Sequence, residues 1–289
     1  EVLATNGDTH LGGDDIDRRV ADLFVNDIRS AFGINLMAYP DHMQIVRLEA
    51  ERAKIRLSDS EKTEIAIDLP EGKGRFTRAL TRDQLEALTT DIVERTLGPC
   101  RLALKDAGLT PEGINEVVLV GGSTRMPLVR DRVQALFGKQ PHCHLNPDEV
   151  VALGAAVQAD ILTGGTTDML LLDVTPLSLG IETMGGVMSS LIRRNTTIPA
   201  SAKEMFTTYV DGQTGVDIHI LQGERELVKD NRSLARFRLK VPPLPAGVPR
   251  IEVTFLIDAN GILNDKAGDM RTGQSQSIEV KPSYGLSDN

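Results

Sequence analysis

The spacing of apolar residues changes character partway along the chain. Up to about residue 165, apolar positions recur every three or four residues over long stretches, which predicts amphipathic helices mixed with a few strands. Beyond residue 177 they alternate with polar residues in short runs between turn dipeptides, which predicts antiparallel strands and almost no helix. We therefore expect two unlike domains, at residues 1–165 and 177–289, with a connector at 166–176.

Long helices and a short strand are predicted in the first half. One helix follows Gly12-Gly13, where acidic residues suit the positive end of the helix dipole. A second lies within residues 41–58, with apolar positions that define one buried face. A third follows a strand at 63–69 and is expected to kink or end near Pro99.

Residues 116–120 form a short β-branched apolar run, which is typical of a buried parallel strand. The segment 121–125, Gly-Gly-Ser-Thr-Arg, then turns the chain into a further helix. Such a turn places free backbone N–H groups beside a surface without side chains, where a planar or anionic ligand can approach. Many turns of this kind bind nothing, so the pattern alone leaves both interpretations open.

Other polar groups in the first half have ordinary explanations when each is taken alone. Glu51, Lys54 and Ser58 share a helical face, which fits a solvated ion pair. The Gly12-Gly13 turn fits a helix cap better than a phosphate site. The segment 142–144, His-Cys-His, has zinc-ligand residue types, but no second cluster accompanies it in the sequence, and we expect no metal.

The connector carries Leu170, Leu171 and Leu172 between Asp168 and Asp173. Glycines precede the segment and a proline follows it, so the pattern favours an extended connector over a helix. A buried strand of either domain fits the same spacing equally well.

In the second half, strict alternation at 216–220 and 251–257 predicts half-buried strands, and Asp211-Gly212 and Asn260-Gly261 supply turns. The pattern predicts an all-β sandwich of about a hundred residues. No Ser/His/Asp set, paired carboxylates or metal cluster is evident in it, so we expect a binding module. Apolar residues near its predicted loops are, on physical grounds alone, more readily core than binding surface: Ile181, Met184, Phe206, Val216 and Ile218.

Composition limits the partners and the cellular compartment that we expect. The net charge is −9 and no basic run occurs, which disfavours nucleic acid as a partner. Two cysteines cannot form a disulfide framework, so we expect a reducing compartment, the cytoplasm. No apolar run approaches the roughly 20 residues that cross a bilayer, so we expect no membrane association. The start at Glu1 lacks an initiator Met, as if the chain were cut from a longer one.

Taken together, the motifs closely resemble those of the DnaK-type heat-shock chaperones over essentially the whole chain. The matching segments are 168–186, 121–127, 146–156 and 221–225. Finer features resemble the HscA branch, which serves iron–sulfur cluster assembly. These features are 206–208, 211–214, 225–228, 232–237 and 280–286.

The resemblance implies an α/β fold, a partial actin-like ATPase lobe, followed by a linker and an antiparallel β-sandwich that holds extended peptides. It implies an ATP or ADP site, with Mg in the full-length family. The implied nucleotide residues are Glu51, Lys54 and Ser58 on one wall, Gly121, Gly122, Ser123 and Arg125 on the other, Asp148 close by, and Gly12 and Gly13 near the phosphates.

For the sandwich, the resemblance implies a peptide cleft with two residues arching over the peptide backbone. The implied lining is Ile181, Thr183, Phe206, Val216 and Ile218, and the arch is Met184 with Tyr209. The linker, Leu170 to Asp173, is implied to dock on the ATPase domain in one nucleotide state and to be released in the other.

The implied function is a stress-response chaperone that binds extended apolar segments of unfolded proteins under ATP control. A J-domain co-chaperone and an iron–sulfur scaffold protein are the implied partners. Two alternatives are a general protein-folding chaperone and, in another class, a stand-alone actin-like ATPase or phosphotransferase. The family's first-lobe phosphate loop and catalytic lysine are not in this sequence, so we assign no catalytic residue and expect negligible ATP hydrolysis by this chain alone.

Two departures from the family pattern concern the sandwich. The sequence ends at 287–289, where a helical lid would start, so peptides are expected to dissociate quickly. Asp265 stands where the family usually has an apolar residue, between Asn264 and Lys266. Either this strand is more exposed than usual or a buried carboxylate weakens the sandwich.

Overall fold

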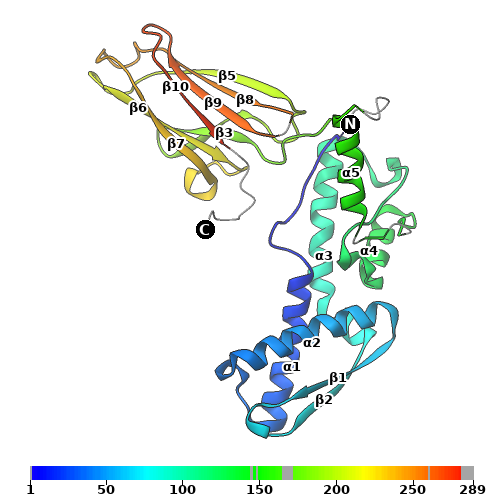
Figure 1. The fold of residues 1–289 in the computed structure, drawn as a ribbon. Helices are drawn as coiled ribbons and strands as arrows, with labels where there is room; N and C mark the ends of the chain where they lie inside the picture. The colour runs from blue at the N-terminus through cyan, green and yellow to red at the C-terminus, as the bar shows by residue number, and fades with distance from the viewer. Residues whose placement is uncertain (1, 144–145, 148, 165–171, 260, 281–289) are drawn as a thin grey trace. The chain divides into compact units, whose positions relative to one another are not determined.

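The computed structural model describes residues 2–143, 146–147, 149–164, 172–259 and 261–280. The chain divides into two compact units, which are drawn in Figure 1 and described one at a time below. The first unit spans Asn6–Asp168, and the second comprises Glu1–Thr5 with Met169–Asn289.

The first unit is mainly helical and contains one β-hairpin. Its helices are α1 (Gly13–Phe32), α2 (Pro40–Asp59), α3 (Arg82–Ala107), α4 (Pro127–Phe137) and α5 (Val150–Leu162), and its strands are β1 (Lys62–Asp68) and β2 (Arg75–Thr81). Short 3-10 turns lie at η1 (Leu36–Ala38), η2 (Pro70–Gly72), η3 (Pro111–Gly113) and η4 (Gly122–Arg125). The predicted strand at 63–69 is thus β1, shifted by one residue.

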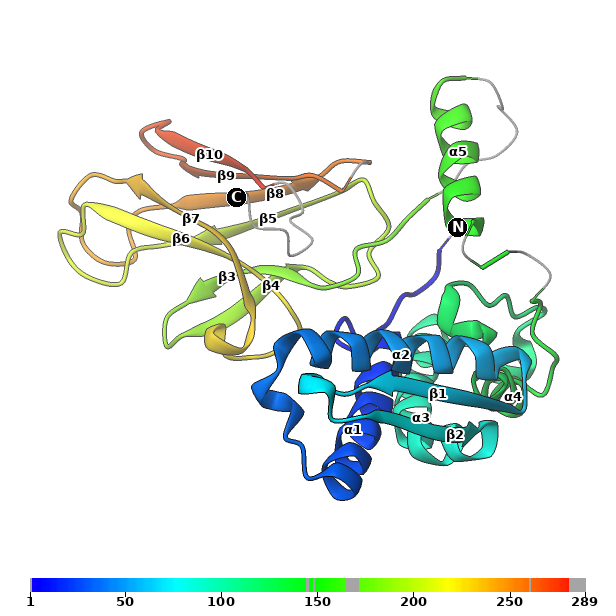
Figure 2. The same ribbon diagram turned by 60° about the horizontal axis from the view of Figure 1, so that its bottom comes forward.

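The core of this unit lies between α1, α2 and the hairpin. Figure 2 shows α2 running along the β1–β2 hairpin, with α1 beside them. The buried face of α2 consists of Val46, Ala50, Ala53 and Leu57, as the three- and four-residue spacing predicts. Phe24 of α1 meets Phe76 of β2 at a ring-centroid distance of 6.3 Å, which joins the helices to the sheet.

Helix α3 does not end at Pro99 but continues to Ala107. A proline inside a helix removes one backbone hydrogen bond, and α3 retains its helical path despite that loss. Gly108 then adopts a left-handed conformation, φ 67°, and closes the helix with its N–H on the Leu104 and Lys105 carbonyls.

The predicted buried strand at 116–120 is not formed as a strand. Only an isolated parallel bridge joins Val118 to His142, with the His142 N–H donating to the Val117 carbonyl at 2.7 Å. Val118 and Val120 are 51% and 48% exposed. An apolar run is buried only where strands and covering layers flank it, and within the described residues this run has a single bridge partner.

The second unit is a β-sandwich of two four-stranded antiparallel sheets, seen in Figure 1. One sheet has the order β4-β3-β6-β7 and the other β10-β9-β8-β5. The strands are β3 (Leu179–Thr183), β4 (Val187–Ile192), β5 (Ala200–Phe206), β6 (Gly215–Gln222), β7 (Arg232–Lys240), β8 (Ile251–Ile257), β9 (Leu263–Asp269) and β10 (Ser275–Val280). A helix/strand region followed by antiparallel sheets confirms the predicted fold class.

Sequence alternation places the strands of the sandwich well. Ile251, Val253, Phe255 and Ile257 of β8 are all buried and point into the core between the sheets. Strands β8 and β9 pair antiparallel, as the predicted turn requires. Of that turn, Gly261 is described, with φ 78°, and Asn260 lies outside the described residues.

Asp265 on β9 is fully buried, with 0% of its surface exposed. It stands opposite Phe255 of β8 and Ile278 of β10. Neither carboxylate oxygen has a hydrogen-bond partner among the described residues. Of the two outcomes expected from the sequence, greater exposure of the strand is therefore wrong. Burial of an unpaired polar group in the sandwich core is the one that occurs.

Candidate functional site

Three segments that are far apart in the sequence meet at the start of α1. A Cβ atom placed on Gly13 would lie 3.0 Å from the Ser123 hydroxyl and 3.1 Å from Lys54 Nζ. The residues come from the N-terminus of α1, from η4 and from α2. Only a glycine at position 13 allows this approach without displacing a neighbour. The structure therefore brings together three of the residues predicted to hold a nucleotide.

Lys54 is held in this site by an acidic residue that the sequence pattern does not reveal. Its Nζ donates to Asp17 Oδ2 at 2.7 Å and to the Gly13 carbonyl at 3.4 Å. The Lys54 and Asp17 side chains are 13% and 15% exposed. The pair is thus largely removed from water, where a charge interaction is stronger than on the surface.

Asp17 is largely buried, and only one of its two carboxylate oxygens is paired among the residues that the structure describes. Burial raises the pKa of Asp17, and the hydrogen bond and charge of Lys54 oppose that rise. Its second oxygen, Oδ1, is buried without a hydrogen-bond partner in the described part of the chain. Asp17 lies one helical turn after Gly13, so helical spacing could have placed it on the same face.

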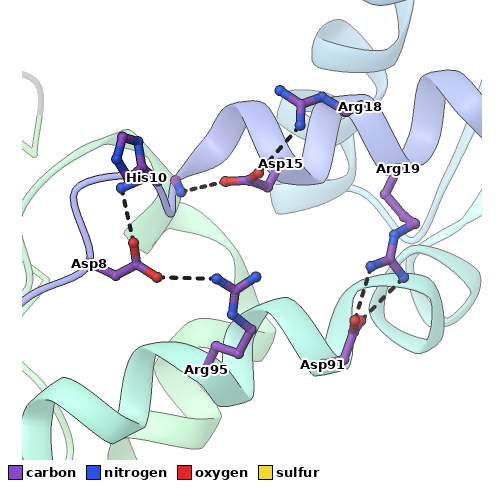
Figure 3. A network of polar contacts seen from close by, with 8 residues as sticks. Asp8, His10, Asp15, Arg18, Arg19, Asp91 and Arg95 are labelled. Atoms are coloured by element: carbon purple, nitrogen blue, oxygen red, sulfur yellow. Dashed lines mark hydrogen bonds and ion pairs between the residues drawn. The ribbon is translucent and has the colours of Figure 1, made fainter. Parts of the chain in front are cut away.

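The N-terminus of α1 is fixed to α3 by ion pairs, shown in Figure 3. Asp8 accepts the His10 N–H at 3.0 Å and pairs with Arg95 of α3 at 3.1 Å. Further along α1, Arg19 pairs with Asp91 of α3 at 2.9 Å, and this hydrogen bond lowers the pKa of the Asp91 carboxyl. These contacts join α1 and the segment leading to Gly13 to α3.

The Gly12 N–H is also occupied, because it donates to Asp15 Oδ2 at 2.9 Å. The Asp15 N–H donates back to the Gly12 carbonyl at 3.2 Å. This reciprocal arrangement caps α1 with backbone and carboxylate groups, as the acidic residues after the glycines predict. The cap explanation of the Gly12-Gly13 turn is confirmed, and the close approach at Gly13 adds a second role.

The turn at 121–125 is stabilised by its own backbone and hydroxyl groups. Gly121 has φ 88°, and its carbonyl accepts the Thr124 N–H at 3.1 Å and the Thr124 hydroxyl at 2.7 Å. The Gly121 N–H donates to the Pro147 carbonyl at 3.2 Å. Arg125 is exposed, and its guanidinium donates to Asn146 Oδ1 at 3.1 Å. The turn therefore joins the start of α4 to the segment before α5.

The remaining predicted nucleotide residues are placed less tightly. Glu51 is exposed on α2, and the Ser58 hydroxyl donates to the Lys54 carbonyl of the same helix at 3.2 Å. Gly122 is exposed within η4. Asp148 lies outside the described residues. The described site thus centres on Gly13, Lys54 and Ser123.

The predicted peptide residues fall into three groups by burial. Ile181 and Ile218 are 3% and 2% exposed and belong to the sandwich core. Phe206 and Val216 are half-buried and pack against that core. Two residues are largely exposed and lie in loops: Met184 at 82% and Tyr209 at 71%.

Thr183 and the loop beyond β5 are fixed by local hydrogen bonds. The Thr183 hydroxyl donates to the Val187 carbonyl at 3.0 Å across the β3–β4 turn. The Tyr209 N–H donates to Gln213 Oε1 at 3.3 Å, and Gln213 Nε2 donates to the Gly215 carbonyl at 2.7 Å. These bonds order the two segments that carry the exposed Met184 and Tyr209.

The sandwich also brings together three polar side chains that the sequence pattern does not reveal. His219 Nδ1 lies 2.7 Å from Glu182 Oε2, and His219 Nε2 lies 2.8 Å from the Ser233 hydroxyl. The three residues stand on β3, β6 and β7, so no short motif signals them. Only the pairing of the strands brings them together.

The predicted linker is described only in its last residues. Leu172 accepts the Val2 N–H at 3.1 Å and Asp173 accepts the Ile198 N–H at 2.9 Å, both through backbone carbonyls. Leu170 and Leu171 lie outside the described residues.

Metal binding and membrane insertion would each require a recognisable group of residues. Within the described ranges, no three His, Cys, Asp or Glu side chains gather in a way that could hold a metal ion. Of the segment 142–144, His144 lies outside those ranges. Among the helices that are described, none is long and apolar enough to cross a membrane.

A comparison with protein families gives the class of the molecule. The chain matches the model described as Hsp70 protein over residues 1–289, its full length. A helical lobe with a glycine-lined polar site and a separate β-sandwich are the parts expected of an ATP-dependent molecular chaperone. The chain belongs to the Hsp70 family, whose members bind ATP with Mg in their full-length form and act on peptide clients with J-domain co-chaperones.

Proposed function

We propose that this chain binds extended apolar peptides through its sandwich, under the control of an adenine nucleotide bound beside α1. The proposal keeps the predicted division into a nucleotide-binding part at 1–165, a linker at 166–176 and a peptide-binding part at 177–289. The observation that carries it is the meeting of Gly13, Lys54 and Ser123, since this juxtaposition links segments about a hundred residues apart.

The donor set at this site fits ATP or ADP. The Lys54 ammonium and the Ser123 hydroxyl can donate to ligand oxygens, and both lie against the side-chain-free face of Gly13. We assign Glu51 and Ser58 to the same wall as Lys54, and Gly121, Gly122 and Arg125 to the wall of Ser123. The nucleotide supplies the phosphoryl group, and these residues bind and orient it.

The sandwich fits a peptide in an extended conformation. Such a peptide offers backbone hydrogen-bonding groups to loops and strand edges and one or two apolar side chains to a pocket, which allows recognition of many sequences. We assign Phe206 and Val216 to the contact with the apolar side chains, because both are half-buried at the rim of the core. Met184 and Tyr209 contact the peptide backbone.

Within the family, we propose the iron–sulfur branch, with an iron–sulfur scaffold protein among the clients. The support is the motif resemblance at 206–208 and 232–237. A general protein-folding role is the competing assignment. The two are separated by comparing a Leu/Pro-rich peptide of the scaffold with an unrelated apolar peptide, since a specialised chaperone discriminates between them and a general one does not.

The peptide assignment is tested by fluorescence anisotropy of a labelled Leu/Pro-rich peptide titrated with the full chain. Saturable binding is expected, and Met184→Ala should raise the dissociation rate several-fold because one side of the arch is lost. Met205→Ala is the matched control, since Met205 is also exposed, at 49%, but is not assigned to the arch. Binding that does not saturate would exclude the peptide site. Equal effects of the two substitutions would remove Met184 from it.

A further inference from the structure

A linear chain of three hydrogen-bonded side chains crosses the outer face of the β4-β3-β6-β7 sheet. Glu182 Oε2 lies 2.7 Å from His219 Nδ1, and His219 Nε2 lies 2.8 Å from the Ser233 hydroxyl oxygen. An ionised carboxylate only accepts hydrogen bonds, so it selects the tautomer with the proton on Nδ1. Nε2 of the neutral imidazole then carries the lone pair that faces the Ser233 hydroxyl.

A β-bulge brings Ser233 to this face. The register of β6 and β7 passes from Ile220↔Ala235 directly to Leu221↔Ser233, so Leu234 is the additional residue. Leu234 and Ala235 both pack against the sandwich core, although consecutive residues of a regular strand point to opposite faces. The bulge therefore directs Ser233 outward, onto the same face as His219.

His219 and Ser233 differ in how far they are buried. His219 is 4% exposed, which shields its imidazole from water and fixes the ring between its two partners. Ser233, in contrast, is an exposed residue on the surface of the sheet. Arg236 stands opposite His219 in the register and places its guanidinium 3.7 Å from Glu182 Oε2. This adds a positive charge beside the set.

We propose that Ser233 is a nucleophile that accepts acyl groups from small activated carboxylic esters, with His219 as its general base and Glu182 as the group that orients His219. A nucleophile within hydrogen-bond reach of a base that is itself oriented by a carboxylate is the general arrangement for such chemistry. Peptide binding and nucleotide binding do not require this set, so the proposal stands apart from the function proposed above.

The step conserves atoms and electrons without a further reactant. Ser233 Oγ forms a bond to the carbonyl carbon of the ester, and its proton passes to His219 Nε2. The bond between that carbon and the leaving oxygen breaks, and the imidazolium returns the proton to the leaving alcohol or phenol. The products are an ester of Ser233 and the free alcohol.

The test is acetylation of the full chain by p-nitrophenyl acetate, followed by peptide mapping in a mass spectrometer. General base catalysis accelerates a proton transfer by about 10²-fold or more, so Ser233 should be acetylated about 100-fold faster than a reference serine. Ser201 on β5 is the internal reference, since it is exposed on a strand of the same sandwich. Nitrophenol release follows the same reaction by absorbance.

Variants separate a reactive serine from a structural one. Ser233→Ala should abolish the fast phase of nitrophenol release, and Glu182→Gln should slow acetylation of Ser233 by about tenfold or more, because the neutral amide no longer fixes the histidine tautomer. Glu182 and Ser233 are not in the core, so neither change should unfold the sandwich. The pH profile of acetylation in Glu182→Gln should also differ from that of the unchanged chain.

Two results would overturn the proposal. One is acetylation of Ser233 at the rate of Ser201 in the unchanged chain. The other is a Glu182→Gln variant that reacts as fast and with the same pH profile, which would assign the three residues to strand pairing alone. Peptide anisotropy on the same samples reports the proposed chaperone activity separately, since Ser233→Ala should leave it unchanged.

Discussion

Each unit contains a buried aspartate, and the two differ in whether the carboxylate has a partner. In the helical unit, Asp17 is 15% exposed and bonds to Lys54 at 2.7 Å. In the sandwich, Asp265 is completely buried, with Phe255 and Ile278 as its cross-strand neighbours and no hydrogen-bond partner among the described residues. Burial raises the pKa of both carboxyls, but Lys54 opposes the rise at Asp17, whereas the pKa of Asp265 reaches about 7.

Burial alone therefore does not determine what a carboxylate does to a fold. The Asp17 carboxylate is paired with Lys54. Removing the carboxylate would leave the Lys54 ammonium buried without a counter-charge, and its desolvation cost would no longer be offset. The Asp265 carboxylate has no partner within the described ranges, so removing this carboxylate removes its desolvation cost. Substitutions at the two sites are expected to change the free energy of unfolding with opposite signs.

The stability of the sandwich should fall as the pH rises from about 4 to about 7. In the unfolded chain the Asp265 carboxyl has the ordinary aspartate pKa of 3.8, and in the folded chain its pKa is raised to about 7. Below both values the group is protonated in both states and its ionisation does not affect stability; between them only the unfolded state ionises, so unfolding becomes easier. Above about 7 the loss is complete, at roughly 4 kcal/mol. Urea unfolding of the full chain at several pH values, followed through the sandwich transition, measures it.

Asp265→Val should remove that pH dependence, so its stabilisation of the sandwich should be larger at pH 8 than at pH 4 by roughly 4 kcal/mol. Asp217→Val is the matched control, because Asp217 is an exposed strand residue of the same sandwich and should change stability by less than about 0.5 kcal/mol. A variant at position 265 that unfolds more easily than the unchanged chain at pH 8 would contradict the assignment.

Asp17→Asn should destabilise the helical unit by roughly 3 kcal/mol, because Lys54 then remains buried without its counter-charge. The double variant Asp17→Asn with Lys54→Met should recover much of the loss, since both charges are then gone. Thermal unfolding followed by circular dichroism at pH 7 measures the cycle. Additive losses in the double variant would show that the two side chains do not interact.

Gly13→Ala should destabilise the helical unit by about 1 kcal/mol, because its methyl group would press on the Ser123 hydroxyl and the Lys54 ammonium. Gly12→Ala is the control, since a Cβ there meets nothing within 4 Å. Combining Gly13→Ala with Ser123→Ala should relieve part of the strain. Equal unfolding temperatures for the two glycine variants would show that the close approach is not present in solution.

Periodicity recovered the elements of the fold that depend on local pattern. The buried face of α2 and the alternation of β8 follow directly from the order of apolar residues. The strand predicted at 116–120 failed because its burial depends on neighbours that the run itself does not specify. Helix α3 continues through Pro99 and ends where Gly108 adopts the left-handed conformation and caps it, so the proline inside the run does not by itself end the helix.

The candidate sites were recovered in part, for a related reason. Local spacing paired Lys54 with Glu51 on one helical face, but the partner in the fold is Asp17 on another helix. The resemblance supplied Gly13 and Ser123 as site residues, and only the fold showed that Ser123 and Lys54 both approach Gly13. Contacts across helices and strands are not encoded in neighbouring residues. They therefore had to come from the structure.

The unpaired carboxyl of Asp265 on β9 also causes the sandwich to take up a proton when it folds. At a pH between the two pKa values of Asp265, the unfolded chain releases a proton that the folded chain holds, so each folding event takes up close to one proton from the buffer. The heat of unfolding measured by calorimetry should then vary with the ionisation enthalpy of the buffer chosen. A single buried side chain thus links the folding equilibrium of the domain to the buffering of its surroundings.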